Sequence, residues 1–340
     1  MDYSEARNNA KALCGKCYVC DNCNGIACKG QIPGMGGKGS GRSFIRNFDM
    51  LTHVKLNMDV LCDNKPIDTS FDFLGYHMAL PVFIAPMAGI KGNFGADMSE
   101  YEYNNIIAKG ADECNIMAFC GDGKDVDNLF VEPFKAMASV NDRAIVTIKP
   151  WVKEGIDLRI DKIKDYDYAF VAMDVDAAGL PLLRNSSIPT ENKNVESLKY
   201  IKDKCQKPFI VKGIMTVAAA KKAIEASCDA IVVSNHGGRV CDDTLSTIEV
   251  LPEIAKVCKG KIKVLVDGGI RTGYDIFKCL ALGADGVLIG RPFGIAAIGG
   301  NKEGIKAYCD KLQSELKDAC VMCGAHNLQE INESMVTFVK

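Results

Sequence analysis

The sequence predicts an α/β protein, a (β/α)8 barrel of the TIM type with a cysteine-rich N-terminal extension. From residue 80 onward, eight short apolar runs that end in Gly, Pro, Ser, Asn or Asp alternate with amphipathic stretches rich in Ala, Lys and Glu. These units fill about 250 residues, the usual size of such a barrel. Before them, five cysteines lie within positions 14–28.

The extension is predicted to span residues 1–43 and the barrel domain residues 44–340. Residues 13–30, LCGKCYVCDNCNGIACKG, hold the cysteines. The following stretch QIPGMGGKGSGRS, at 31–43, is rich in glycine and has no apolar periodicity, which is typical of a connector. A lead-in, FIRNFDMLTHVKLNMDVLCD, then precedes the first barrel strand.

Eight barrel strands are predicted from short, continuous apolar runs, the pattern of parallel strands that are covered by helices. They are PVFIAP (81–86), NIMAF (115–119), AIVTIK (144–149), AFVAMD (169–174), FIVKG (209–213), AIVVSN (230–235), KVLVDGG (263–269) and GVLIG (286–290).

The stretches between these runs are predicted to be helices. Thr216 is a suitable N-cap for TVAAAKKAIEASC, and Gly283 ends the helix in GYDIFKCLALGA. Eight equivalent units favour a closed barrel over an open doubly wound sheet, which is the competing fold.

Composition excludes several classes of protein. The chain has 340 residues, 48% of them hydrophobic, and a net charge of −2, which gives no attraction to nucleic acid or to a membrane surface. No signal-type apolar segment begins the chain and no run approaches a membrane span, so a cytoplasmic location is expected. Scattered cysteines are expected to be small buried hydrophobes in a reducing compartment: Cys205, Cys228, Cys258 and Cys279.

The turns after strands 7 and 8 predict a phosphate site. DGGIRTG (267–273) and GVLIGRP (286–292) combine glycines, which let backbone N–H groups approach an anion, with Arg271 and Arg291. The alternative is two tight turns with arginines that face solvent. Phosphate binding is favoured because both turns follow the strands at which such barrels commonly hold phosphate.

The ends of strands 4, 5 and 6 predict an acid–base site. Asp176, Lys212, His236 and Arg239 should meet at one mouth of the barrel. We expect His236 to act as a general base with Asp176 holding its tautomer, and Arg239 to bind a carboxylate. Lys212 would stabilise negative charge that develops on a cofactor. A single loop histidine is usually a surface residue, so the prediction depends on the whole set.

Three segments also carry a family resemblance: VSNHGGR (233–239), VLVDGGIRTGYDIFKCLALGADGVLIGRPF (264–293) and PFIVKGI (208–214). They resemble the FMN-dependent α-hydroxy-acid oxidases and dehydrogenases, which include glycolate oxidase and lactate oxidase. The resemblance extends from about residue 44 to about residue 335. It implies a barrel with FMN at its mouth, oxidation of a small 2-hydroxy acid to the 2-oxo acid, and a homotetramer.

The resemblance also implies roles for individual residues. His236 would take the substrate proton with Asp176 as its partner, and Arg239 would bind the substrate carboxylate. Lys212 would lie against the N1/C2=O edge of the flavin, and Ser234 beside the ring. The other implied FMN contacts are Ala85, Pro86 and Met87 after strand 1, and Asp267, Gly268, Gly269, Arg271, Gly290 and Arg291 at the ribityl chain and phosphate.

The sequence departs from the family pattern at three places. Strand 3 carries Thr147 and Lys149 where the family has a Gln that touches flavin and a Tyr that touches substrate, and the N-terminal substrate Tyr has no counterpart. The second substrate arginine corresponds to Arg184, at a shifted position. A second reading is the type 2 isopentenyl diphosphate isomerases, which also use FMN but lack His-Gly-Gly-Arg. Whether the substrate loses a hydride or forms a carbanion is left open, as is the electron acceptor.

The N-terminal cysteines leave three interpretations. Cys14, Cys17 and Cys20 have the opening spacing of a ferredoxin-type cluster, but Cys23 follows after two residues rather than three and no proline follows Cys28. Thiolates at this spacing also suit zinc, and the third interpretation is an unliganded thiol segment. An iron–sulfur cluster that accompanies a flavoenzyme ranks first, and a non-catalytic electron-transfer protein is the competing class. Cys320 and Cys323 are expected to be buried helix-side thiols.

Overall fold

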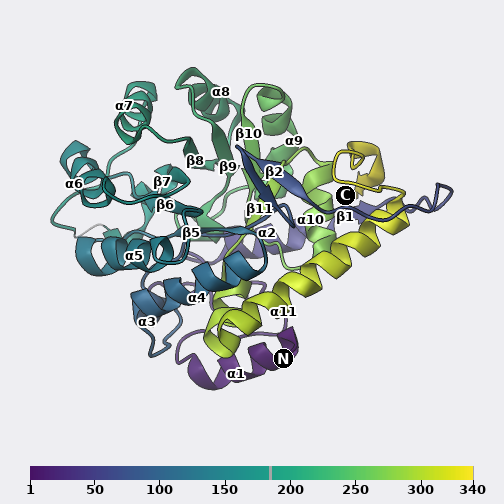
Figure 1. Cartoon of the computed structure of the whole chain (residues 1–340), viewed down its shortest axis with the longest axis horizontal. Helices are drawn as coiled ribbons and strands as arrows, with labels where there is room; N and C mark the ends of the chain where they lie inside the picture. The colour runs from purple at the N-terminus through teal and green to yellow at the C-terminus, as the bar shows by residue number, and fades with distance from the viewer. Residues whose placement is uncertain (184–185, 340) are drawn as a thin grey trace.

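The computed structural model describes residues 1–183 and 186–339, and its centre is a closed barrel of eight parallel strands (Figure 1). Around the barrel the order is β10-β11-β4-β5-β6-β7-β8-β9. The strands are β4 (Val82–Ile84), β5 (Met117–Cys120), β6 (Ala144–Ile148), β7 (Phe170–Asp174), β8 (Phe209–Ile214), β9 (Ala230–Val233), β10 (Lys263–Val266) and β11 (Gly286–Ile289). Each coincides with one of the eight predicted runs, with β5 and β8 ending one residue beyond theirs, so the predicted (β/α)8 fold is confirmed.

Apolar residues fill both faces of these strands, which is why their runs are continuous rather than alternating. Every residue of β5, β6, β7 and β9 is buried. At the N-terminal end of the barrel, the hairpin of β2 (Phe71–Phe73) and β3 (Tyr76–Met78) inserts Phe73 between Phe83 and Phe170, with ring centroids 5.0 and 5.8 Å away. This end is closed, so any site must lie at the opposite mouth.

Helices surround the barrel, and their ends follow the sequence signals. Thr216 accepts the amide hydrogen of Ala219 as the predicted N-cap, and Gly283 has φ +101° just after the end of its helix. The helices after the first strand are α3 (Ile90–Asn93), α4 (Glu100–Glu113), α5 (Glu132–Ala138), α6 (Lys153–Ile163), α7 (Val195–Cys205), α8 (Val217–Glu225), α9 (Thr247–Cys258), α10 (Gly273–Ala281) and α11 (Arg291–Cys323).

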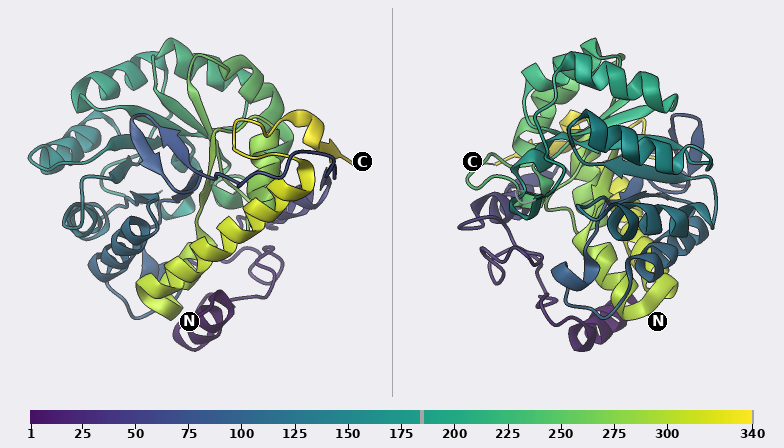
Figure 2. Two further views of the ribbon diagram at one scale, coloured as in Figure 1. Left: turned by 45° about the vertical axis from the view of Figure 1, so that its right-hand side comes forward. Right: turned by 90° about the vertical axis from the view of Figure 1, so that its left-hand side faces the viewer.

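The N-terminal helix α1 (Tyr3–Leu13) lies beside the first half of α11 (Figure 2). The two helices approach closely because α11 presents glycines: a Cβ at Gly299 would collide with the carbonyl of Ala6. Helix α11 is broken at Asn301, where φ is 50°. The extension is therefore tied to the C-terminal part of the barrel.

The rest of the extension lies on the barrel mouth. Amide hydrogens of Lys16 and Cys17 bond to the carbonyl of Phe94, and that of Lys38 bonds to the carbonyl of Gly238. Helix α2 (Arg42–Thr52) then leads to β1 (Val54–Leu56), which pairs with β12 (Val336–Phe338). The glycine-rich stretch is thus packed against the barrel.

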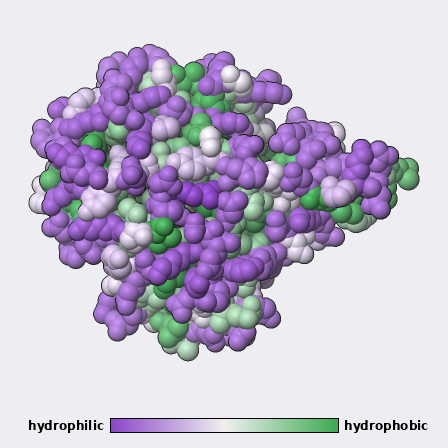
Figure 3. All heavy atoms as spheres, in the orientation of Figure 1, coloured by the Kyte–Doolittle hydropathy of each residue, from purple (hydrophilic) through white to green (hydrophobic). Residues whose placement is uncertain are grey.

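Outside these layers the surface is mostly hydrophilic on the face shown in Figure 3. A loop between β1 and β2 projects at the right of Figures 1 and 3 and exposes Met58, Val60 and Leu61. None of the described helices combines the length and the apolar character needed to cross a membrane. Cys320 and Cys323 are buried on α11, as predicted, and so are the four scattered cysteines.

Candidate functional site

A cavity of about 400 Å³ lies at the C-terminal ends of the barrel strands. Residues that end or follow each of the eight strands line it, which is the expected place for a site in this fold. Pro33 and Met35 of the extension complete its wall. The predicted residues that line it are Ala85, Pro86, Met87, Lys149, Lys212, His236, Arg239, Asp267, Gly268, Gly269, Arg271, Gly290 and Arg291.

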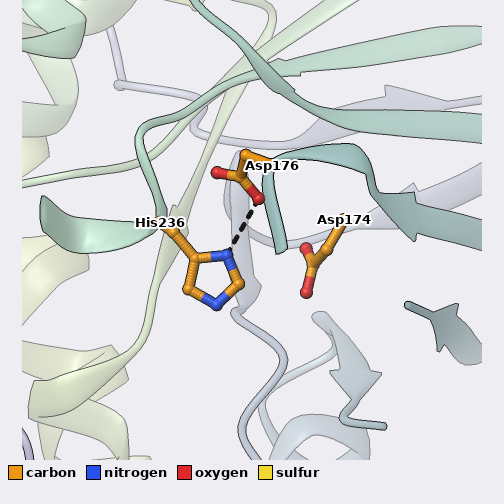
Figure 4. Close-up of side chains that lie close together, drawn as sticks. All are labelled: Asp174, Asp176 and His236. Carbon is orange, nitrogen blue, oxygen red and sulfur yellow. Dashed lines mark hydrogen bonds and ion pairs between the residues drawn. The ribbon is translucent and has the colours of Figure 1, made fainter. Parts of the chain in front are cut away.

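His236 and Asp176 form the predicted acid–base pair (Figure 4). His236 Nδ1 lies 2.9 Å from Asp176 Oδ1, which joins the end of β9 to the end of β7. Burial lowers the pKa of His236, and this effect is only partly opposed by Asp176, so the ring is neutral at pH 7. With Nδ1–H donated to the carboxylate, Nε2 is left as a free base.

Asp174 is a functional residue that the sequence argument missed. Its Oδ2 lies 2.7 Å from Lys149 Nζ and its Oδ1 lies 3.2 Å from Lys212 Nζ. Burial alone would raise the pKa of Asp174, but the two lysines hold it well below its usual range. It also lies within 4.8 Å of ligand atoms of Asp176 and His236 (Figure 4). Its position as the last residue of the predicted run AFVAMD was the available signal.

Lys212 lies between two carboxylates, since Asp267 Oδ2 is 3.5 Å from its Nζ. Burial alone would lower the pKa of Lys212, but Asp174 and Asp267 raise it, so the ammonium stays charged. Burial raises the pKa of Asp267 itself. Within the part of the chain that the structure describes, the second oxygen of Asp267, Oδ1, has no hydrogen-bond partner.

A second buried ion pair, between Arg159 and Asp122, holds the backbone of Lys149 in place. Asp122 accepts the backbone amide hydrogen of Lys149 at 2.8 Å, the indole N–H of Trp151 at 2.7 Å and Arg159 Nε at 2.8 Å. Both charged side chains are essentially inaccessible to solvent. Nothing in the sequence distinguished Asp122 and Arg159 from surface charges.

The three predicted anion-binding arginines all donate to backbone carbonyls of the extension. Arg271 and Arg291 line the cavity rather than facing solvent, which rules out the alternative interpretation of their turns. Burial, together with the nearby charge of Arg291, lowers the pKa of Arg239 to about 9. The contacts are Arg239 Nη1 to Gly34 at 2.8 Å, Arg291 Nε to Met35 at 2.8 Å and Arg271 Nη2 to Cys23 at 2.7 Å.

The turn after strand 7 needs glycine because of its backbone conformation and because another segment passes close to it. Gly268 and Gly269 have φ +99° and +84°, and a Cβ at Gly269 would collide with the backbone of Asn47 on α2. Around Gly290, in contrast, the nearest atom to an added Cβ is 3.5 Å away. Glycine is therefore needed in the strand 7 turn partly because α2 passes too close to leave room for a side chain.

These residues fit FMN. Buried oxygens of Thr147, Asp176 and Asp267 have no hydrogen-bond partner among the described residues, which suits a ligand that carries several hydrogen-bond donors. Two arginines at the glycine turns suit a phosphate. Ser234 is buried and accepts the amide hydrogen of His236. The predicted substrate residue Arg184 lies outside the described residues.

The cysteine segment borders a second cavity, of about 730 Å³, lined by Cys20, Cys23, Arg7 and Arg271 among others. Burial raises the pKa of Cys17 to about 12. In the part of the chain that the structure describes, no three cysteine sulfurs lie within 4.8 Å of one another. A tetrahedral zinc site with bonds of about 2.3 Å brings its sulfurs to about 3.8 Å.

Comparison with known proteins gives a consistent result. A profile of the family described as FMN-dependent dehydrogenase matches residues 34–188 and 183–338. A peroxisomal (S)-2-hydroxyacid oxidase of Arabidopsis thaliana is 30% identical over 88% of this chain and 90% of its own length, and an L-lactate dehydrogenase of Caulobacter vibrioides is 27% identical over 88% and 91%. A mandelate oxidase variant with benzaldehyde superposes with a TM-score of 0.79 at 25% identity, over 99% and 98% of the two chains. Residues 1–33, with all five N-terminal cysteines, lie outside the profile match.

Proposed function

Because the chain belongs to the FMN-dependent dehydrogenase family, we propose that it binds FMN and oxidises a 2-hydroxy acid to the 2-oxo acid. The observation that carries this proposal is the His236–Asp176 pair, at 2.9 Å, beside a cavity that also holds Arg239 and Lys212. Together they offer a base, a carboxylate site and a cation for the cofactor.

The geometry supports a role for each of these residues. Nε2 of His236 takes a proton from the substrate, and Asp176 stabilises the imidazolium that results. Arg239 binds the substrate carboxylate through its guanidinium. Bound FMN would supply the two-electron acceptor. Lys212 offsets negative charge at the cofactor, and Arg271 and Arg291 hold its phosphate.

The cavity wall supports an aliphatic substrate. Leu129, Leu180, Leu182 and Leu183 line it together with Lys149. We propose that Lys149 contacts the polar end of the substrate. Each additional CH₂ group that is buried adds about 0.8 kcal/mol, or about fourfold in kcat/KM. We therefore expect longer aliphatic 2-hydroxy acids to be better substrates than glycolate.

An anaerobic titration tests the proposal. Purified protein is mixed with glycolate, lactate and longer 2-hydroxy acids, and the visible absorbance of oxidised flavin is followed. We expect bleaching of the flavin by hydroxy acids. A colourless protein whose spectrum is unchanged by added FMN would refute the proposed FMN-dependent activity. Metal or thiol signals without bleaching of the flavin would favour the non-catalytic electron-transfer protein.

We also propose that Cys14, Cys17, Cys20, Cys23 and Cys28 bind metal, with an iron–sulfur cluster ahead of zinc. The spacing of Cys14, Cys17 and Cys20, which matches the opening of a ferredoxin-type motif, supports this order. Protein prepared anaerobically should contain stoichiometric iron and acid-labile sulfide, both lost in the Cys17→Ala/Cys20→Ala variant. Zinc without iron would support the structural site, and no metal would leave the thiol interpretation.

A homo-oligomer, tetrameric by resemblance, is proposed as well, with the exposed apolar loop at Met58, Val60 and Leu61 as a candidate subunit contact. Light scattering of the purified protein tests this state. The sixteen free cysteines support a cytoplasmic, reducing location.

A further inference from the structure

Asn93 ends the short helix α3 and lines the barrel cavity. The residue is half-buried, and its Oδ1 accepts a hydrogen bond from Arg239 Nη2 at 3.1 Å. Arg239 is the group that we propose for binding the substrate carboxylate. A residue 146 positions earlier in the chain therefore contacts the substrate-binding arginine directly.

The orientation of the Asn93 amide follows from the chemistry of its two partners. Its Nδ2 donates to the carbonyl of Ala88 at 2.8 Å, and a carbonyl can only accept. Its Oδ1 accepts from a guanidinium, which can only donate. If the oxygen and the nitrogen were exchanged, both hydrogen bonds would be lost. The amide is therefore held with its oxygen toward Arg239.

Helix α3 is held at both ends, which makes it a rigid support for this amide. At its N-terminal end, the carboxylate of Glu100 on α4 accepts the amide hydrogens of Gly89 at 3.1 Å and Ile90 at 2.6 Å. Just beyond its C-terminal end, the carbonyl of Phe94 accepts the amide hydrogen of Lys16 of the extension at 2.9 Å. The helix is thus tied to both α4 and the extension.

The partners of Arg239 are neutral. Its Nη1 donates to the carbonyl of Gly34 at 2.8 Å and its Nη2 to Asn93, and among the described residues it forms no ion pair with a carboxylate. These two bonds leave a second N–H on each terminal nitrogen, and the N–H of Nε, for a further acceptor. Met35 Sδ, 3.8 Å from Nη1, is only a weak acceptor. The guanidinium is therefore fixed in place and still able to bind an anion.

We propose that Asn93 is a positioning residue for Arg239, and that its neutral amide keeps this arginine available to the substrate carboxylate. The proposal rests on the proposed function. The amide orients the guanidinium without neutralising it, so the carboxylate of a 2-hydroxy acid supplies a counter-charge that the described residues do not. A carboxylate at position 93 would have nearly the same shape, but it would pair with Arg239 and repel the substrate.

Two variants test the oxygen that faces Arg239. Asn93→Ala and Asn93→Asp both lose the hydrogen bond to the carbonyl of Ala88, so the difference between them reports on the side that faces the arginine. Anaerobic stopped flow gives the apparent Kd for a 2-hydroxy acid and the limiting rate of flavin reduction. We expect Asn93→Ala to raise this Kd about 2- to 12-fold, the effect of losing one hydrogen bond.

Asn93→Asp should raise the Kd for the acid more than Asn93→Ala does, because like charges side by side in a binding site are strongly unfavourable. The limiting rate should change little in both variants, because neither replaces the base His236. The amide of the same 2-hydroxy acid carries no charge. Asn93→Asp should therefore weaken binding of this amide, measured by competition with the acid, much less than binding of the acid itself.

The matched control is Asn57→Asp, which adds the same charge far from the cavity lining. Asn57 is exposed in the β1–β2 loop, and its amide also joins a donor to a carbonyl: it accepts from the hydroxyl of Thr337 at 2.9 Å and donates to the carbonyl of Ser334 at 2.8 Å. This variant should leave both constants unchanged. Circular dichroism and the Kd for FMN check that each variant is folded.

A Kd for the acid in Asn93→Asp within about twofold of the wild-type value would overturn the proposal. Equal weakening of the acid and its amide would also overturn it, and so would a lower limiting rate with an unchanged Kd. If Asn93→Asp does not fold, Asn93→Ala is judged by the same comparison of acid and amide. If 2-hydroxy acids bleach the wild-type flavin while one of these results is found, only the role of Asn93 fails. If no 2-hydroxy acid bleaches it, the proposed function fails together with this role.

Discussion

Replacing Asp174 with Asn tests the buried charge network beneath the cavity. Asp174 is the carboxylate that contacts both lysines, at 2.7 Å from Lys149 and 3.2 Å from Lys212, and all three side chains are less than one-tenth exposed. In the variant, Lys212 keeps Asp267 at 3.5 Å, but Lys149 loses its only carboxylate among the described residues. One buried ammonium is left without a counter-charge.

The magnitude follows from that single loss. Breaking a buried ion pair by removing one partner lowers the free energy of unfolding by about 3–5 kcal/mol. The matched control is Asp310→Asn, which breaks a 2.7 Å pair with Lys306 on the surface of α11. An exposed pair at this helical spacing contributes only about 0.3–0.5 kcal/mol.

Urea denaturation measures both variants, with the fluorescence of Trp151 as the signal, because this is the only tryptophan in the chain and it is fully buried beside the network. The folded-state pKa of Asp174 is depressed, so its contribution is present above the unfolded pKa of about 3.9 and disappears as the pH falls below it. The difference between wild type and Asp174→Asn should therefore persist at pH 5–8. A loss no larger than that of Asp310→Asn would refute this account of the network.

Four further outcomes are expected. His236→Ala should retain flavin and lose about 10²–10⁴-fold in the rate of reduction by hydroxy acid, measured by stopped flow; a wild-type rate would show that the base is wrong. Arg239→Lys should raise KM for hydroxy acids more than for a neutral alcohol, because the bidentate geometry is lost. Arg291→Ala should weaken FMN itself, seen as free flavin after gel filtration. In a pH profile, kcat/KM should rise as His236 loses its proton below pH 6.5 and then stay level, because the Arg239 guanidinium remains charged.

The barrel and its acid–base residues could be predicted because each depends on a local pattern. A strand buried on both faces has a continuous apolar run, and the residue that follows it lies at the mouth. His236, Asp176 and Lys212 were found in this way, without knowledge of any contact between them. The predicted strand ends placed these residues at one mouth of the barrel, although the sequence does not give the distances between them.

What could not be predicted depends on contacts between distant segments. Arg159 lies on α6 and has the surroundings of a surface residue in the sequence, yet it is buried against Asp122, 37 positions away. Gly34 and Met35 accept hydrogen bonds from the arginines through their backbone carbonyls, with Met35 Sδ as a further, longer contact of Arg239. A backbone acceptor leaves no trace in the side-chain pattern. The 31–43 stretch was therefore interpreted as a connector, although it forms part of the site wall.

The contact between α1 and α11 also sets the order of events during synthesis. About 280 residues separate the end of α1 from the start of α11, so at 5–20 residues per second the ribosome needs roughly 15 to 55 seconds to supply the partner helix. During this interval α1 has left the ribosome while the helix that packs against it has not been made. The first helix of the chain therefore reaches its final packing only when the chain is nearly complete.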